Sequence, residues 1–236
     1  MLLLWRYILL INRDMLNYIQ NTSAYHVTWL QRINPIYRIL SDKSYIDEFF
    51  KNGNIFLSSF KNFKKYDDEM QGDKTEGQNL IGGFNGKDTS QFVSYEGGIK
   101  AFVLCATNSL DENVIKDFNG VGAIKINDSV NFGKEIARKL PYVITGIEGD
   151  CIYGDSKVQT LENEKNKAFH NIDFKNPISI KEELSQITLG VEMFMKHKKY
   201  EHQQEHRLLW FSEVQIENGI VIHCPEAIKY CDKIIF

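Results

Sequence analysis

Three short stretches of the 236-residue sequence carry polar side chains in settings where they could do chemistry. The first is Tyr37-Arg38, inside an apolar run, where a buried arginine needs an anion or a carboxylate as partner. The second is Ser58-Ser59 at a strand end, whose hydroxyls could bond backbone, a ribose hydroxyl or a carboxylate. In the third, Gln203 and Glu205 share one face of an extended stretch, so both could address one ligand.

Each stretch also has a purely structural interpretation. Arg38 could form a structural ion pair with an aspartate, while Ser58 and Ser59 form a turn. Gln203 and Glu205 could belong to the solvated face of an edge strand. Alternatively, Glu205 could be half of a buried structural pair with Arg38 or Arg207. Both interpretations stay open at the level of the sequence.

Two groups of residues raise the question of a metal. Three imidazoles with an open coordination position could hold zinc, but the spacing of His197, His202 and His206 beside Glu205 matches no zinc signature. A divalent ion could also bind an acidic turn that consists of Asp67, Asp68, Glu69 and Asp73. A solvated acidic turn is the preferred interpretation, and we expect no metal.

Composition narrows the class of protein. A net charge of −3 argues against a surface that binds nucleic acid all over, although a local basic patch stays possible. The four cysteines form no Cys-x-x-Cys pair, which favours reduced thiols and a cytoplasmic location. The apolar run from Met1 to Ile11 is too short to span a bilayer and lacks a signal cleavage site, so we expect no membrane anchor. Met15 could be a second translation start.

The order of apolar runs and turn signals predicts an α+β fold with a mixed or antiparallel sheet and peripheral helices. Residues 1–34 are expected to form a helical N-terminal extension, and residues 35–236 a single domain. A short helix is expected from about Tyr45 to Lys51, with a cap within Ser41-Asp42-Lys43-Ser44 and Gly53 as its C-terminal stop. The predicted strands are Ile36–Leu40, Ile55–Ser58, Ala101–Ala106, Gly122–Ile126, Tyr142–Ile144, Asp150–Tyr153, Arg207–Phe211, Ile220–Ile222 and Lys233–Phe236.

Two longer segments carry expectations of their own. Residues 60–100 are polar and rich in glycine, which predicts a long loop that could cover the site. Residues 180–199 show a helical apolar period and are predicted to form the longest helix, with a basic last turn. A shorter helix is expected over residues 131–139.

These motifs resemble a widespread bacterial family of domains of unknown function, some of whose members are associated with phage defence. That family has a Tyr-Arg strand, a Gly-x-Ile/Leu-x-x-Ser-Ser-x-x-x-Phe stretch before an acidic turn, and a late Lys…aromatic…Glu-x-Glu-x-Arg-Leu. The counterparts are Tyr37-Arg38, Gly53 to Phe63 with Asp67-Asp68, and Lys196 to Leu208. The sequence departs from the pattern at Gln203, which replaces the first glutamate of the late motif, and at Tyr66-Asp67-Asp68, which replaces an Asn-Asp-Pro turn.

The same stretches are distantly similar to ADP-ribosyltransferases, which implies that NAD is the substrate. By this resemblance Arg38 would hold the pyrophosphate, and Ser58 or Ser59 would orient the catalytic carboxylate. Glu205 would bond the nicotinamide ribose and Gln203 would position a macromolecular acceptor, protein or nucleic acid. Tyr37, Phe63 and Tyr200 would line the cofactor site.

The implied activity is that of a toxin or a phage-defence effector. Two other functions stay open. One is a non-catalytic nucleotide or nucleic-acid sensor of a defence system. The other is a metal-dependent phosphodiesterase or nuclease that uses Asp67, Asp68 and Glu205.

Overall fold

The computed structural model describes residues 16–20, 34–65, 74–85, 89–188 and 190–236. These residues form helices and a mostly antiparallel sheet, which confirms the predicted α+β class. The chain divides into two compact units. Among the described residues, one consists of 77–97 and 152–198, and the other of the described parts of 12–76, 98–151 and 199–236. None of the helices in the described ranges combines the length and hydropathy needed to cross a bilayer.

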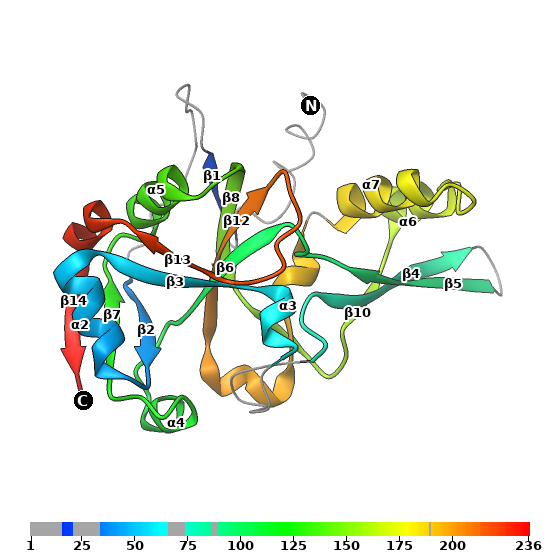
Figure 1. Ribbon diagram of the computed structural model, residues 1–236. Coiled ribbons are helices and arrows are strands. Elements are labelled where there is room, and N and C mark those ends of the chain that lie inside the picture. Colours follow the sequence, from blue (N-terminus) through cyan, green and yellow to red (C-terminus); the bar gives the residue numbers. More distant parts are fainter. Residues whose placement is uncertain (1–15, 21–33, 66–73, 86–88, 189) are drawn as a thin grey trace. The chain divides into compact units, whose positions relative to one another are not determined.

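The larger unit is built on a nine-stranded sheet (Figure 1). Its main path runs β1-β8-β12-β6-β2-β7-β14, while β3 joins β6 and pairs in turn with β13. All pairings in this sheet are antiparallel. The strands are β1 (Leu16–Gln20), β2 (Ile36–Leu40), β3 (Asn54–Ser59), β6 (Ala101–Thr107), β7 (Gly122–Ile126), β8 (Val143–Asp150), β12 (Glu205–Ser212), β13 (Ile220–His223) and β14 (Cys231–Ile235).

Short helices border this sheet. They are α2 (Lys43–Asn52), α3 (Phe60–Phe63), α4 (Glu112–Asp117) and α5 (Ser129–Lys139), with the 3₁₀ segments η2 (Lys198–Gln203) and η3 (Pro225–Tyr230). The helix begins two residues before the predicted start, with its cap at Asp42 inside the predicted stretch, and the predicted stop at Gly53 is confirmed. The Asp42 side chain accepts a hydrogen bond from the Ser44 amide at 2.8 Å, and Gly53 ends the helix in the left-handed conformation with φ of 75°.

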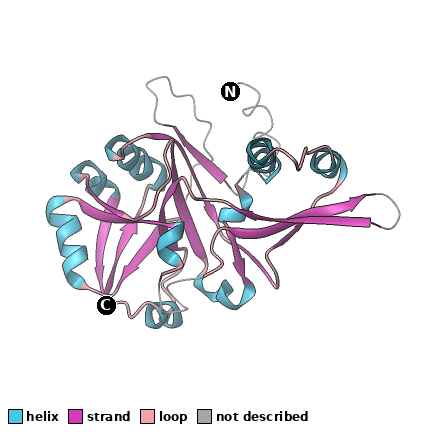
Figure 2. Ribbon diagram, turned by 45° about the vertical axis from the view of Figure 1, so that its right-hand side comes forward, coloured by secondary structure: helices cyan, strands magenta, loops and turns pink. Residues whose placement is uncertain are grey.

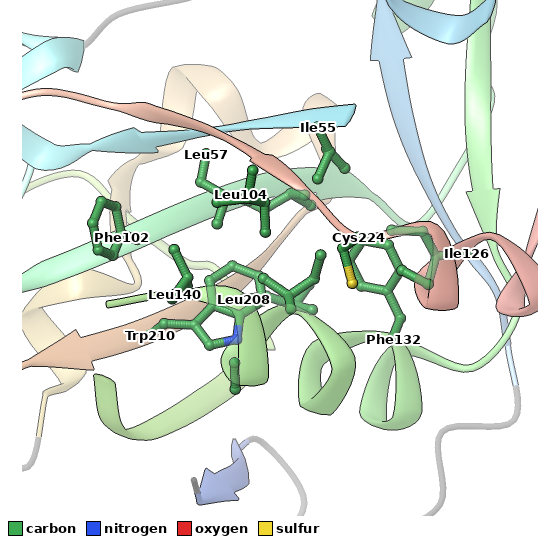
Figure 3. Close-up of a cluster of buried hydrophobic side chains, with 14 of the residues drawn as sticks. Ile55, Leu57, Phe102, Leu104, Ile126, Phe132, Leu140, Leu208, Trp210 and Cys224 are labelled. Carbon is green, nitrogen blue, oxygen red and sulfur yellow. The ribbon is translucent and has the colours of Figure 1, made fainter. Parts of the chain in front are cut away.

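One hydrophobic core fixes the strands of the larger unit (Figure 3). Leu104 of β6 and both Leu208 and Trp210 of β12 pack with Phe132 of α5 in this core. Trp210 is fully buried, and its indole Nε1 donates to the Gly133 carbonyl at 2.9 Å. This bond satisfies the polar N–H group that burial removes from water. The core therefore fixes the alternation of side chains on β6 and β12, and with it the face on which each polar residue lies.

The smaller unit is a three-stranded sheet with two helices on one face (Figure 2). Its strands run β10-β4-β5, and a separate parallel pair joins β9 and β11. Ile81 of β4 packs with Phe169 and Leu184 from the two helices. The elements are β4 (Gln78–Asn85), β5 (Thr89–Glu96), β9 (Ile152–Gly154), β10 (Val158–Thr160), α6 (Asn163–His170), α7 (Pro177–Thr188), η1 (Val191–Met193) and β11 (Met195–His197).

Three expectations about elements are wrong. Residues 78–85 and 89–96 form the antiparallel strands β4 and β5, not part of a long loop. The helix expected over 180–199 ends at Thr188, because Gly190 takes the left-handed conformation with φ of 83°, and β11 and η2 follow. Residues 16–20 are a strand, not part of a helical extension. The rest of the expected extension, residues 1–15 and 21–33, lies outside the described residues.

Candidate active site around strand β6

Strand β6 connects all three sequence stretches that could do chemistry. It pairs with β2, which carries Tyr37 and Arg38, with β3, which carries Ser58 and Ser59, and with β12, which begins at Glu205. Thr107, the last residue of β6, lies directly opposite both Tyr37 and Glu205. Three stretches that lie 20 to 168 positions apart in the sequence are thus each carried by a strand that pairs with β6.

The register divides these side chains between two faces of the sheet. Residues directly opposite each other in paired strands share a face, and successive residues alternate. Tyr37, Thr107 and Glu205 therefore share one face. Arg38 lies on the other face, together with Ile36, which belongs to the hydrophobic core. By the register, Arg38 and Glu205 therefore lie on opposite faces of the sheet, and Tyr37 shares the face of Glu205.

Arg38 is held by backbone. Its Nη1 atom donates to the carbonyl oxygen of Cys105 on β6 at 2.8 Å, and its side chain is partly buried. This bond ties β2 to β6 where the two strands have a single pair of opposed residues.

The two serines of β3 are buried at the start of α3. Ser59 caps this helix, and its Oγ accepts from the Asn62 amide at 3.2 Å. The Ser58 hydroxyl lies 3.4 Å from the Ser59 carbonyl, a long hydrogen bond. Phe63, at the end of α3, packs edge-on against Phe60 with ring centroids 6.2 Å apart. The sequence interpretation of the serines as turn formers thus describes Ser59 well.

Glu205 belongs to a buried ion triad in which the pair with Arg207 agrees with the structural interpretation from the sequence, whereas the third member, Glu76, was missed. Arg207 Nε donates to Glu205 Oε1 at 2.5 Å, while Nη1 and Nη2 donate to the two oxygens of Glu76 at 2.9 and 2.8 Å. Arg207 is 1% exposed and Glu205 6%. The Phe60 ring lies 5.9 Å from the guanidinium carbon. Glu205 is therefore a fixed carboxylate and not part of a solvated edge.

The triad holds one more negative charge than positive. Burial alone lowers the pKa of Arg207, but the Cys151 thiol, Glu205, Glu76 and the Cys105 thiol together raise it well above its usual value. Arg207 therefore stays charged, and it compensates two carboxylates in a region shielded from water. The partner Glu76 is 131 residues away in the sequence, so no local pattern could have revealed the triad.

Gln203 and Tyr200 are buried beside the start of β12. The Gln203 carbonyl accepts from the Thr107 hydroxyl at 2.7 Å, and its side chain is 1% exposed. Tyr200 is buried, and the Lys199 ammonium lies 4.8 Å from its ring centroid. Thr107 thus ties Gln203, the last residue of η2, to the end of β6.

A second polar cluster lies on the opposite face of β12 and was also missed. His206 Nδ1 is 2.6 Å from Asp150 Oδ1, and its Nε2 is 3.3 Å from Glu148 Oε2. Ser129 of α5 donates to the other Glu148 oxygen at 3.0 Å. Carboxylates accept and cannot donate unless protonated, so an imidazolium suits both contacts of His206.

These contacts separate the histidines that were considered as zinc ligands. His206 is held by Asp150 and Glu148, while His202 Nε2 bonds Asp117 Oδ2 at 2.6 Å. Within the described ranges, no group of three or more His, Cys, Asp or Glu side chains has the arrangement of a metal site. The acidic turn of residues 67–69 and 73 lies outside the described residues.

The smaller unit contains a buried acid of its own. Glu192 is 2% exposed, and the structure gives its Oε2 atom no hydrogen-bond partner. Burial raises the pKa of Glu192 to about 7, against the lowering effect of bonds from its own backbone and from Thr188. Tyr95 lies close enough to feel this charge, and burial first, then Glu192, raises the pKa of Tyr95 to about 12.

Comparison of the sequence with models of known protein families and with curated proteins, and of the fold with solved structures, gave no match.

Proposed function

We propose that the protein is an ADP-ribosyltransferase-like enzyme that cleaves NAD and transfers ADP-ribose to a macromolecular acceptor. The observation that carries the proposal is the junction of the three motif-bearing strands β2, β3 and β12 on β6. We infer the reaction from the resemblance of the motifs to ADP-ribosyltransferases. The strand pairing supports this inference, because it brings the three motifs together on β6. A toxin or phage-defence role follows from the same resemblance.

The chemistry suits a fixed carboxylate. Cleavage of the bond between ribose and nicotinamide builds positive charge on the ribose, and a preorganised carboxylate stabilises that charge as it develops. Glu205 is held in one position by Arg207, which in turn is held by Glu76. Tyr37 and Thr107 lie on the same face of the sheet and would contact the substrate, while Gln203 would direct the acceptor.

Arg38 requires a different role from that of the resemblance. Because the register assigns it to the other face of the sheet, we propose that Arg38 fixes β2 against β6 through Cys105.

The burial of Glu205 favours a second candidate function. A carboxylate that is 6% exposed and bonded to Arg207 has little surface for a substrate. A non-catalytic nucleotide sensor would use the same strands without needing Glu205 to reach the ligand.

Incubation with labelled NAD and a cell lysate tests the proposal. Protein, RNA and DNA fractions are separated and counted, with nicotinamide release as a second readout. Label in one fraction with release of nicotinamide supports the transferase. Reversible NAD binding without nicotinamide release would replace it with the sensor, and neither binding nor release would overturn both.

A further inference from the structure

The backbone is strained at the residue between Gln203 and Glu205. Gln204 has φ of 42°, in the left-handed region that residues with a side chain rarely adopt. Its side chain is exposed, so no contact of that side chain explains the conformation. Such backbone geometry persists only where the surroundings enforce it, and it is common at functional sites.

Asn108, the first residue after β6, supplies the enforcing contacts. Its backbone amide donates to the Gln204 carbonyl at 3.0 Å, and its side-chain Nδ2 donates to the same oxygen at 3.2 Å. The other hydrogen of Nδ2 serves Asp150 Oδ1 at 2.8 Å. Both donors of one amide group are therefore committed to holding Gln204 against β8.

The Asn108 contact continues into the interior of the unit. Asp150 also contacts His206, which reaches the buried Glu148, and Glu148 is anchored to Ser129 of α5. On the other side of the kink, the Glu205 carbonyl accepts from the Cys151 amide at 2.8 Å. The carbonyls of Gln204 and Glu205 are thus tied to the end of β6 and to the end of β8, respectively.

We infer that Asn108 is a positioning residue: with Asp150 and His206 it clamps the left-handed kink at Gln204 and so fixes where the side chains of Gln203 and Glu205 lie. The clamp explains why two residues on either side of a kink can both be buried and yet belong to different elements, η2 and β12. Its consequence for catalysis rests on the proposed function, whereas the clamp itself does not.

Asn108→Asp tests the clamp, because it keeps the shape of the side chain but replaces the donor with an acceptor beside two acceptor oxygens. Hydrogen exchange of the intact chain is measured for peptides that cover residues 148–152 and 203–208. We expect exchange there to rise roughly tenfold, the equivalent of one lost hydrogen bond of ordinary strength. Asn54→Ala is the control, since the Asn54 side chain bonds the exposed side chains of Glu48 and His223, which lie outside both peptides.

Two further variants separate the kink from a general loss of stability. Gln204→Gly removes an exposed side chain and adopts positive φ without strain, so its exchange pattern should match the wild type. Gln204→Val places a β-branched residue in the left-handed region and should reproduce the effect of Asn108→Asp. Unchanged protection in both Asn108→Asp and Gln204→Val would overturn the clamp.

NAD turnover then decides the catalytic consequence. If the wild type consumes NAD, Asn108→Asp should lower kcat at least tenfold with little change in KM, because a displaced carboxylate loses transition-state contacts. Unchanged kcat together with raised exchange would restrict the clamp to folding and overturn its role in catalysis. A wild type that does not consume NAD would remove the proposed function, while the exchange data would still decide the clamp.

Discussion

At the scale of single residues, the buried charge of Arg207 dominates the surroundings of the candidate site. It is the cation that compensates Glu76 and Glu205 in their buried cluster. A buried ion pair is weak evidence for stability in itself, but removal of one member leaves the others uncompensated. This asymmetry gives a sharp test of the triad.

Arg207→Met should destabilise the protein by about 3–5 kcal/mol, because two buried carboxylates lose their cation. Chemical denaturation at neutral pH measures the effect. Lys125→Met is the control: the Lys125–Asp232 pair is partly exposed and should contribute far less to stability. Equal effects of the two variants would contradict the triad.

Glu192 predicts a pH dependence in the smaller unit. Its folded pKa of about 7 lies above the ordinary value of 4.5, so the folded state binds the proton more tightly than the unfolded state. The stabilisation is present below about pH 4.5 and is lost as the pH rises through 7. A full loss of roughly 3 kcal/mol corresponds to this difference in pKa.

Glu192→Gln should remove that dependence, because an amide is neutral throughout the range. Hydrogen exchange of β4, β5 and η1 at about pH 5.5 and 8, corrected for the intrinsic rate, measures the effect. Glu182→Gln, on the exposed side of α7, is the matched control and should keep the wild-type dependence. If Glu192→Gln keeps the same pH slope as the wild type, the buried acid is not its source.

At the scale of elements, α2 shows how a helix end can be rigidly specified. Gly53 has φ of 75°, and a Cβ atom added there would lie 2.3 Å from the backbone nitrogen of Pro225. Gly53→Ala should therefore destabilise the protein by about 1–3 kcal/mol through backbone strain, with additional cost from the contact. Thermal denaturation measures this, with the exposed Lys51→Ala as control. An unchanged melting temperature for Gly53→Ala would contradict the tight junction of α2 and η3.

The elements that the sequence predicted correctly have local causes. Asp42 and Gly53 define α2 through contacts within a few residues, and the runs at 36–40 and 122–126 are strands at the predicted residues. The pairing of β4 with β5 was missed for a reason that is not local. Gly82 suggests a loop, yet it lies inside β4, where a Cβ atom would be 2.0 Å from the Gln91 carbonyl of β5. Only the paired strand shows why glycine is needed.

Strands β2, β3 and β12, which carry residues 37–38, 58–59 and 205, each pair with β6, and the roles of these residues stay predictions. The contacts of Arg207 with Glu76, and of His206 with Glu148 and Asp150, could not be predicted, because these carboxylates come from distant parts of the chain. The face of Arg38 was also beyond reach, since it depends on the single opposed pair between β2 and β6.

At the scale of the whole molecule, the proposed function requires that Glu205 is a fixed carboxylate that acts on NAD. Glu205→Gln removes its charge and keeps its shape, while Glu76 still binds both terminal nitrogens of Arg207. The amide oxygen of the new side chain can still accept from Arg207 Nε. Folding should therefore change much less than in Arg207→Met.

The most direct test is nicotinamide release by folded Glu205→Gln protein beside the wild type, with the melting temperature of each. We predict a rate lower by roughly 10²–10³-fold, the usual cost of one lost electrostatic partner in a transition state. Glu217→Gln, at an exposed ion pair with Lys61, should keep the wild-type rate. A Glu205→Gln protein that melts like the wild type and releases nicotinamide at the full rate would contradict the account.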